Sequence, residues 1–226
     1  MRINDLQWDS QLFGYSVGKI EIDNSEFDPL RFLEFSANYK LVYLFSSKPI
    51  DTLPENTILV DTKVTLVKEL GGIQDWDDVE FFEGKLSESL ISLGFQSGEL
   101  SRFKIDKRLS KNEFEKLYIK WLERDLNSGK IIIQKIERKM AGLITLRFSG
   151  DQSSIGLFAV DNAYRGKGIG YKLLQAAQYI SVKNGIKKIS VQTQFQNKRA
   201  ISLYEKFGFV QQNKKYIYHY VNPKNT

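Results

Sequence analysis

Residues 160–170 read Val-Asp-Asn-Ala-Tyr-Arg-Gly-Lys-Gly-Ile-Gly, between an apolar stretch that ends at Val160 and an amphipathic stretch that begins near Ile169. We expect a strand before this loop and a helix after it. The alternating glycines free the backbone to turn its N–H groups toward one point. The helix N-terminus adds positive charge, as do the side chains of Arg165 and Lys167. The loop therefore predicts a binding site for a phosphate or pyrophosphate group.

Three nucleotide-binding patterns compete for this loop. A Walker P-loop requires Ser or Thr after Gly-Lys, but Gly168 follows Lys167. A Rossmann fingerprint requires a glycine at the position of Tyr171 and a βαβαβ run around it. The pattern that matches is the Arg-x-x-Gly-x-Gly loop that holds coenzyme A, made by Arg165, Gly168 and Gly170. The alternative that needs no ligand is a glycine-rich β–α turn.

The amino-acid composition excludes several kinds of catalytic and metal site in this chain. The 226 residues include no cysteine and one histidine, His219, which excludes disulfides, thiolate zinc sites, paired-histidine metal sites and an acyl-cysteine intermediate. We expect no metal, and we interpret His219 as structural. The net charge of +6 fits an anionic ligand, but the lysine pairs at 187–188 and 214–215 are too scattered to indicate nucleic-acid binding. Without an apolar span or a signal-peptide pattern, we expect a cytoplasmic protein with no membrane insertion.

The C-terminal part of the chain predicts elements in the order α-β-β-β-α-β-α-β-β. Ser110 and Glu113 form a capping box, and Gly129 ends the helix that they begin. Mostly antiparallel strands with interspersed helices are typical of an α+β layered sheet. The expected strands are 130–136, 140–148, 152–160 and 186–194, the later helices begin at 169 and span 198–206, and 208–221 form a final β pair.

The N-terminal part predicts a smaller α/β lobe. Asp28 and Pro29 are a helix start, with a carboxylate at the N-cap and proline at the first helical position. Leu30, Leu33 and Ala37 are expected to share one face of this helix. The expected strands are 15–22, 40–46 and 57–68.

A boundary between two lobes is expected near the end of a further helix. Leu86, Leu90 and Leu93 lie at helical spacing, and Gly94 is the expected stop. We therefore divide the chain into an N-terminal lobe, 1–95, which is expected to shape acceptor choice, and a second lobe, 96–226.

A second motif lies downstream of the glycine loop. From Asn197 to Phe209 the sequence fits Asn-x-x-Ala-x-x-x-Tyr-x-x-x-Gly-Phe. Together with the loop at 165–170, this pattern resembles the Gcn5-related N-acetyltransferase (GNAT) superfamily over roughly residues 100–221. The resemblance implies a GNAT-like α+β fold, acetyl-CoA as co-substrate, and direct attack of an amine on acetyl-CoA in a ternary complex.

The resemblance also implies a coenzyme A site. The loop would hold the pyrophosphate, and the backbone of Phe158 and Val160 would face the pantetheine and the thioester. Asn197 would contact the coenzyme arm, which is compatible with its role as a helix N-cap. The expected cofactor-binding residues are Phe158, Val160, Arg165, Gly166, Lys167, Gly168, Ile169, Gly170 and Asn197.

Tyr204 stands where the family places its general acid. With reference pKa values of about 10 for tyrosine and about 8.5 for a thiol, proton transfer to the departing thiolate is about 2 kcal/mol uphill, which proximity can supply. The alternative is a core tyrosine, since Ala200, Leu203, Tyr204 and Phe207 share one helical face. The motif position favours the acid.

No general base is assigned from the sequence. Many relatives use a carboxylate in the strand before the loop, but residues 152–160 contain none. Glu137, Asp161 and Glu205 are the nearest acidic residues, and each fits a surface or turn position. Water is an adequate acceptor for the proton of a sugar amine.

A second resemblance concerns the acceptor. Residues 8–14, Trp-Asp-Ser-Gln-Leu-Phe-Gly, resemble the opening of bacterial sugar-nucleotide amino-group acetyltransferases, such as the dTDP-fucosamine acetyltransferases of surface-polysaccharide synthesis. Aromatic faces suit a base and a sugar, and arginine suits a diphosphate. Tyr118 and Trp121 fit the core stripe of their helix equally well. The expected acceptor-binding residues are Trp8, Phe13, Arg102, Phe103, Tyr118 and Trp121.

The leading prediction is an enzyme that acetylates the amino group of a nucleotide-linked amino sugar. A protein, peptide or small-amine N-acetyltransferase is the alternative within enzymes, and it predicts an open groove. A module that binds acyl-CoA without turnover is the alternative outside them, against which Tyr204 and Asn197 argue. The expected partner is a small-molecule acceptor, not a nucleic acid, and the chain is expected to act as a monomer or a homodimer.

Overall fold

The computed structural model describes residues 2–22, 27–72, 76 and 80–225. Within these residues, ten strands form one mixed sheet in the order β1-β2-β3-β10-β4-β9-β8-β7-β6-β5. The pairs β2–β3 and β8–β9 are parallel, and the other pairs are antiparallel. The strands are β1 (Asn4–Asp5), β2 (Val17–Ile22), β3 (Leu41–Ser46), β4 (Thr57–Glu69), β5 (Glu80–Phe81), β6 (Ile131–Ile136), β7 (Lys139–Ser149), β8 (Gln152–Val160), β9 (Lys188–Gln194) and β10 (Val210–Val221).

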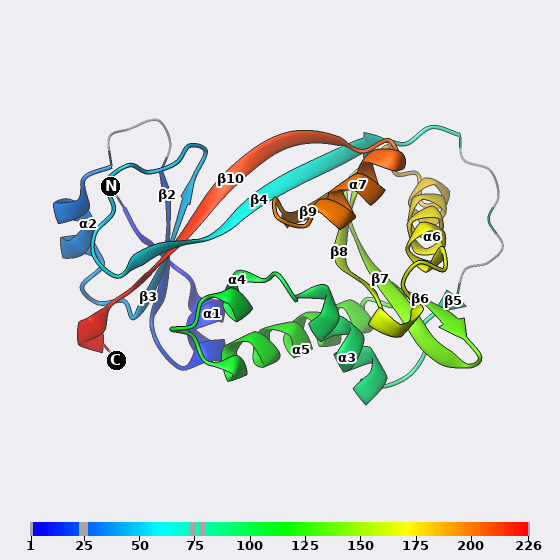
Figure 1. Ribbon diagram of the computed structural model, residues 1–226, viewed down its shortest axis with the longest axis horizontal. Coiled ribbons are helices and arrows are strands. Elements are labelled where there is room, and N and C mark those ends of the chain that lie inside the picture. The colour runs from blue at the N-terminus through cyan, green and yellow to red at the C-terminus, as the bar shows by residue number, and fades with distance from the viewer. Residues whose placement is uncertain (1, 23–26, 73–75, 77–79, 226) are drawn as a thin grey trace.

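The helices pack against this sheet, which confirms the predicted α+β class (Figure 1). Two single 3₁₀ turns, at Asn162–Tyr164 and Pro223–Asn225, complete the described elements. The helices are α1 (Gln7–Phe13), α2 (Pro29–Phe35), α3 (Glu88–Ser97), α4 (Arg102–Ile105), α5 (Lys111–Asn127), α6 (Ile169–Lys183) and α7 (Lys198–Lys206).

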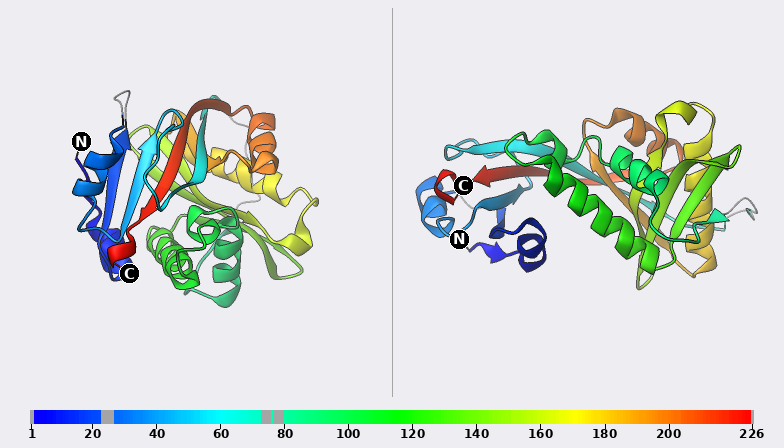
Figure 2. Two further views of the ribbon diagram at one scale, coloured as in Figure 1. Left: turned by 60° about the vertical axis from the view of Figure 1, so that its left-hand side comes forward. Right: turned by 90° about the horizontal axis from the view of Figure 1, so that it is seen from below.

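The sheet carries helices on both faces around β6–β8. Neighbouring residues of β7 point to opposite sides: Leu143 packs in the cluster with α3 and α5, and Ile144 packs in the cluster with α6. In the view from below, α5 crosses under the middle of the molecule (Figure 2). A third apolar cluster lies at the other end of the sheet, where Phe32 of α2 packs edge-on against Tyr220 of β10 at a ring distance of 5.2 Å.

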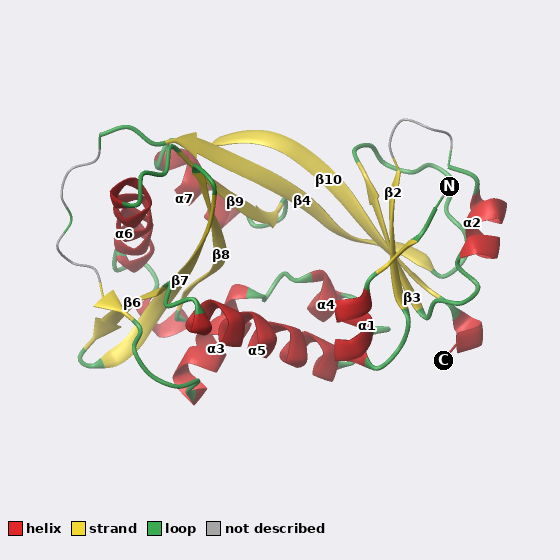
Figure 3. Cartoon of the chain, turned by 180° about the vertical axis from the view of Figure 1, so that it is seen from behind, coloured by secondary structure: helices red, strands yellow, loops and turns green. Residues whose placement is uncertain are grey.

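Two long strands, β4 and β10, connect the two ends of the molecule (Figure 3). They pair with each other, β10 also pairs with β3, and β4 also pairs with β9. The C-terminal strand thus lies between two strands of the N-terminal part, and both termini lie at the same end, near α2 (Figure 1). A division into lobes 1–95 and 96–226 stays a prediction, and the strand order interleaves the two parts.

The pairing between β8 and β9 stops before β8 ends, which opens a gap in the sheet. The parallel strands β8 and β9 are paired only from Gln152 opposite Lys188 to Ile155 opposite Val191. Beyond that point the strands are no longer hydrogen-bonded, although β8 continues to Val160. A register shift between β7 and β8 accompanies this separation. The gap leaves the backbone of the later part of β8 free toward a ligand.

Several helix-end predictions are confirmed. The Asp28 side chain accepts hydrogen bonds from the N–H groups of Leu30 and Arg31, and Ser110 and Glu113 form the capping box of α5. The φ angle of Gly129 is +66°, just after α5 ends. These ends were predictable because each depends on a few neighbouring residues.

Two sequence predictions are wrong. Gly94 does not end a helix but lies inside α3, where a Cβ would be 2.6 Å from Leu122 Cδ1; its small size serves helix packing. Residues 210–221 form one long strand with a register shift near Gln211, not a β pair.

Candidate active site

The glycine loop folds as the sequence predicts, at the junction of β8 and α6. Gly166 and Gly168 have φ angles of +80° and +76°, which residues with a Cβ rarely adopt, and Gly168 caps α6. Arg165 Nε donates to the carbonyl of Val160 at 3.2 Å, and its guanidinium lies 3.5 Å from Glu99. The loop is therefore tied to the strand before it and to the end of α3.

The amide groups of this loop are available to an anion. Among the described residues, the N–H groups of Gly166, Lys167 and Gly168 donate to no protein acceptor. The first amides of α6 lack intrahelical acceptors, as at any helix start. A phosphate or pyrophosphate would satisfy these donors, so the loop fits the phosphate end of coenzyme A.

A cavity of about 470 Å³ extends from this loop along the gap between β8 and β9. Gly170 forms part of its wall because a Cβ there would lie 3.3–3.5 Å from Leu203, Phe158 and Val160. Of the nine expected cofactor-binding residues, eight line this cavity. The ninth, Lys167, lies on the loop outside the cavity, with its ammonium group over the ring of Tyr164. The lining residues from that prediction are Phe158, Val160, Arg165, Gly166, Gly168, Ile169, Gly170 and Asn197.

Helix α7 brings Asn197 and Tyr204 to the same place. The Asn197 side chain accepts from the N–H of Ala200 at 3.3 Å and donates to Thr193 Oγ1 at 3.2 Å, which confirms its role as an N-cap. Tyr204 is 3% exposed and packs against the rings of Phe158 and Phe209. Burial raises its pKa above the ordinary value of 10, so it is protonated at neutral pH.

A second cavity of about 440 Å³ adjoins the first, on the side of α4 and α5. The structure brings Arg102, Phe103, Tyr118 and Trp121 into its wall, as predicted for the acceptor site. Tyr204 lines this acceptor cavity as well. Among the described residues, five line both cavities and mark the place where the cavities meet: Ser97, Phe158, Gln194, Asn197 and Ala200.

The other two residues predicted for the acceptor site lie elsewhere. Phe13 is buried at the end of α1, where its ring packs 5.8 Å from that of Phe103. Trp8 lies on α1 with 49% of its surface exposed, and it does not line the cavity. Phe13 therefore supports a cavity residue from behind, and Trp8 stands apart from the site.

The acceptor cavity contains unpaired cations. Arg147 is neutralised by Asp125, whose carboxylate lies 3.2 Å from both Nε and the terminal nitrogen. Within the part of the chain that the structure describes, Lys63 and Arg102 form no ion pair. The guanidinium of Arg102 rests on the rings of Tyr43 and Phe103 at 4.7 and 4.6 Å, and its Nε is buried without a partner. Two cations thus face the cavity without a protein anion bound to them.

Sequence reasoning missed three residues of this site: Asp61 and Lys63 of β4, and Gln194 at the end of β9. Residues 61 and 63 look like the solvent-facing side of an alternating strand, but that side lines the acceptor cavity. The three acidic residues named as the nearest candidates for a base lie elsewhere. Glu137 and Glu205 are exposed, and Asp161 accepts from Gln96 and from the N–H of Ala163. No local signal links β4 to β9, because the two strands are far apart in the sequence.

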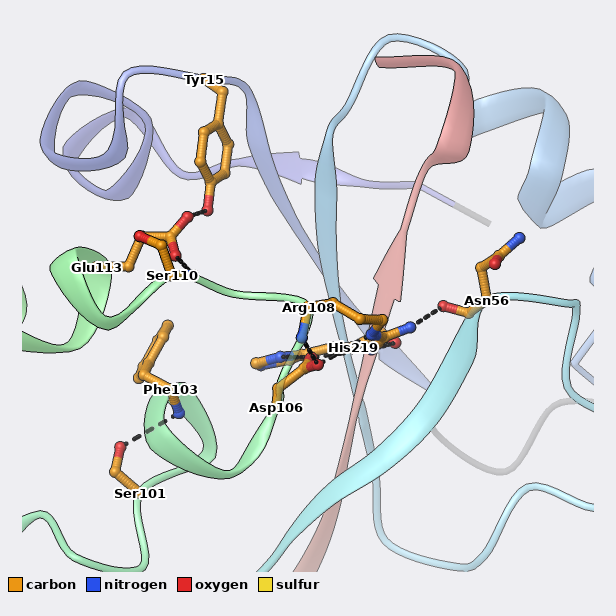
Figure 4. Close-up of polar contacts among 9 residues, drawn as sticks. All are labelled: Tyr15, Asn56, Ser101, Phe103, Asp106, Arg108, Ser110, Glu113 and His219. Carbon is orange, nitrogen blue, oxygen red and sulfur yellow. Dashed lines mark hydrogen bonds and ion pairs between the residues drawn. The ribbon is translucent and has the colours of Figure 1, made fainter. Parts of the chain in front are cut away.

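A buried polar cluster lies beside Phe103, whose ring centroid is 5.9 Å from that of His219 (Figure 4). His219 Nδ1 lies 3.0 Å from Asp106 Oδ2, and Arg108 binds both oxygens of Asp106 at 2.9 Å. Arg108 also donates to the backbone carbonyls of Asn56 and His219, which ties β4 and β10 to the segment between α4 and α5. His219 is fully buried, and its interpretation as a structural residue stays a prediction.

A second contact in the same view fixes the N-terminal segment on α5 (Figure 4). The Tyr15 hydroxyl donates to Glu113, and the backbone N–H of Ser110 donates to the same carboxylate. One capping residue thus serves both the helix and the packing of the segment before β2.

The described residues contain no helix long and apolar enough to cross a membrane and no group of three or more acidic or histidine side chains able to hold a metal ion.

Comparison with known proteins finds similarity to acetyltransferases. Residues 99–209 match the family described as "Acetyltransferase (GNAT) family". The matched segment is just under half of the chain, and this part is similar to acetyltransferases of that family. A solved structure of a functionally unknown conserved protein from Staphylococcus epidermidis shares the fold, with a TM-score of 0.60, 15% identity and coverage of 95% of this chain and 88% of that one.

Two curated relatives match parts of the chain. The spore coat polysaccharide biosynthesis protein SpsD of Bacillus subtilis is 27% identical over 135 residues, which are 59% of this chain and 47% of SpsD. N-alpha-acetyltransferase 30 of Xenopus laevis is 38% identical over 65 residues, which are 29% of this chain and 24% of that protein. The chain thus spans less than half the length of each of these relatives.

Proposed function

We propose that the protein transfers the acetyl group of acetyl-CoA to the amino group of a nucleotide-linked amino sugar, a precursor of a surface polysaccharide, in the cytoplasm. The observation that carries this proposal is the pair of cavities that meet at Phe158, Gln194 and Asn197. One cavity has the free amide groups that a pyrophosphate needs. The other has the size of a small-molecule site, aromatic walls, and the free cations Lys63 and Arg102.

The acceptor cavity supports a phosphorylated small molecule over a peptide. Arg102 presents a guanidinium held flat on aromatic rings, a geometry suited to phosphate oxygens. The rings of Tyr118 and Trp121, 4.9 Å apart, offer apolar surface for a sugar or base. The name of SpsD, a polysaccharide biosynthesis protein, agrees with this chemistry.

The transfer step needs a proton donor and a held thioester. The amine attacks the thioester carbonyl carbon, the carbon–sulfur bond breaks, and coenzyme A leaves as a thiolate. Tyr204, which lines the acceptor cavity and touches Phe158, is the proposed donor of the proton to that thiolate. The free backbone of Phe158 and Val160 at the gap is the proposed holder of the pantetheine and the thioester.

The second candidate is acetylation of protein N-termini, which the similarity to N-alpha-acetyltransferase 30 favours. Coenzyme A release should be measured with acetyl-CoA and two sets of acceptors: UDP-glucosamine and dTDP-fucosamine, and short peptides with free N-termini. We expect turnover with an amino-sugar nucleotide and none with peptides. Turnover with peptides alone would reject the sugar assignment, and acetyl-CoA binding without turnover on any acceptor would indicate a binding module.

A further inference from the structure

One carboxylate lies in the acceptor cavity, at the level of the cavity junction. Among the described residues that line this cavity, Asp61 is the only acid. In the sheet, Lys63 of β4 lies opposite Gln194 of β9. The N–H of Phe195 donates to the carbonyl of Thr62 at 2.7 Å. The segment around Asp61 therefore runs beside the end of β9, where Gln194 lines both cavities.

The Asp61 side chain is buried but incompletely paired. The residue is 3% exposed, and its Oδ1 has no hydrogen-bond partner among the described groups. A buried carboxylate oxygen without a donor is costly, so natural proteins rarely keep one without a use. A substrate N–H directed into the cavity would supply the missing donor.

The charges around Asp61 favour proton exchange near neutral pH. Burial raises the pKa of Asp61 to about 6, although Lys63, Arg102 and Gln194 act in the opposite direction. The same surroundings lower the pKa of Lys63 to about 8, through burial and the nearby Arg102. Tyr118 of α5 is the other titratable group of the cavity wall near Asp61: burial raises its pKa most, and the charge of Asp61 adds to this rise. A carboxyl of this kind is charged at pH 7 and can accept a proton.

We infer that Asp61 binds the acceptor amine and acts as its general base, an inference that rests on the proposed acetyl transfer. The amine nitrogen forms a bond to the acetyl carbon, the carbon–sulfur bond breaks, and the proton lost by nitrogen passes to Asp61. The thiolate takes its proton from Tyr204, so the two proton transfers occur on opposite sides of the carbonyl. Lys63 and Arg102 hold the anionic part of the same acceptor.

The test is the pH dependence of kcat with saturating acetyl-CoA and the most active amino-sugar nucleotide of the panel. For the unchanged enzyme we expect kcat to fall as the pH decreases through the range around 6. Asp61→Asn should lower kcat by about 10²- to 10⁴-fold. Its remaining activity should increase with pH over the range where the unchanged enzyme has reached a plateau, because solvent must then remove the proton. Acetyl-CoA binding should be unchanged.

Two variants make the result specific. Glu205→Gln removes an exposed carboxylate next to Tyr204 in sequence and should leave the profile unchanged. Lys63→Gln should move the acid limb to higher pH, because it removes a cation that lowers the pKa of Asp61. This shift tests the inference even if Asp61→Asn fails to fold.

The outcomes separate the two proposals. If the unchanged enzyme acetylates no amino-sugar nucleotide, the proposed function fails, and the role of Asp61 fails with it. If the unchanged enzyme is active and Asp61→Asn has the same kcat and pH profile, the function stands and the base assignment is rejected. An acid limb that stays in place in Lys63→Gln also rejects the base assignment.

Discussion

Tyr204 shows how burial changes the expectation for a single side chain. The reference pKa values predict a tyrosine only slightly too weak to protonate a thiolate. The structure buries the hydroxyl and raises its pKa, which makes it a weaker acid. A thiolate released into the same apolar surroundings is also destabilised, so its demand for a proton increases in parallel. The direction of proton transfer therefore depends on the pKa of Tyr204 and the pKa of the coenzyme A thiol in the same cavity.

Replacing Tyr204 with Phe should lower kcat by about 10²- to 10³-fold, because the phenol is the proposed acid. The dissociation constant of acetyl-CoA should remain within about twofold, since the ring packing is kept. Steady-state kinetics and calorimetry check the two parts. Tyr179→Phe on α6, outside both cavities, is the control. An unchanged kcat in Tyr204→Phe would exclude this residue as the acid.

Gly168→Ala should weaken coenzyme A binding and cost about 1 kcal/mol of folding stability, because its φ of +76° is strained for alanine. Gly129→Ala is a matched control, with a φ of +66° and open space around the missing Cβ. Both variants should show a similar decrease in stability in urea, but only Gly168→Ala should bind coenzyme A less tightly. Equal coenzyme A affinities in the two variants would contradict the role of the loop.

At the scale of elements, local signals predicted most of what the structure shows. The glycine loop, the capping box and the Asp28-Pro29 start depend on neighbouring residues, and all three are confirmed. Gly94 could not be predicted correctly, because its role depends on Leu122 of another helix. Asp61 could not be found for the same reason: its place in the cavity depends on strand pairing between distant segments.

The close approach of α3 to α5 is testable at Gly94. Alanine at this position favours the helix by about 1 kcal/mol, but its Cβ would lie 2.6 Å from Leu122 Cδ1 in a fully buried contact. Overpacking typically costs about 1–3 kcal/mol, so we expect Gly94→Ala to lower the free energy of unfolding by about 1 kcal/mol. Urea unfolding measures this change. The added cost should shrink in a Leu122→Ala background, and an equal cost in both backgrounds would contradict the contact.

At the scale of the whole molecule, the cluster of His219, Asp106 and Arg108 joins segments that are far apart in the sequence. It ties β4 and β10 to the connection between α4 and α5, behind Phe103. The cluster reaches the acceptor cavity through Phe103, which packs against His219 and lines the cavity. The sequence could indicate a structural histidine, but not its partners.

This cluster makes folding stability depend on pH. Burial lowers the pKa of His219 to about 4 in the folded protein, against its ordinary 6.5. Between these values the unfolded chain binds a proton at His219 that the folded chain does not bind. The contribution of His219 to the free energy of unfolding is therefore full above pH 6.5 and is lost as the pH decreases toward 4. Asp106 acts in the same direction but only below its ordinary value of 3.8: burial would raise its pKa, but the hydrogen bonds from His219 and Arg108 outweigh burial and lower it.

Urea midpoints should be measured from pH 7 to pH 4.5 for the unchanged protein and for His219→Gln. His219 lowers the stability toward acid, whereas the raised pKa of Asp61 acts in the opposite direction over the same range. His219→Gln should be less stable at pH 7, and its midpoint should lose less, or gain more, toward acid than that of the unchanged protein, because the histidine is gone. An identical pH dependence in the variant and the unchanged protein would contradict the assignment to His219.

The central claim is that the gap between β8 and β9 holds the thioester where the two cavities meet. A crystal structure with coenzyme A bound tests it most directly. We predict the pyrophosphate on the amides of residues 166–170, the pantetheine along Phe158 and Val160, and the sulfur facing the acceptor cavity near Tyr204. Coenzyme A bound elsewhere, or with its sulfur directed away from Tyr204 and Gln194, would contradict the claim.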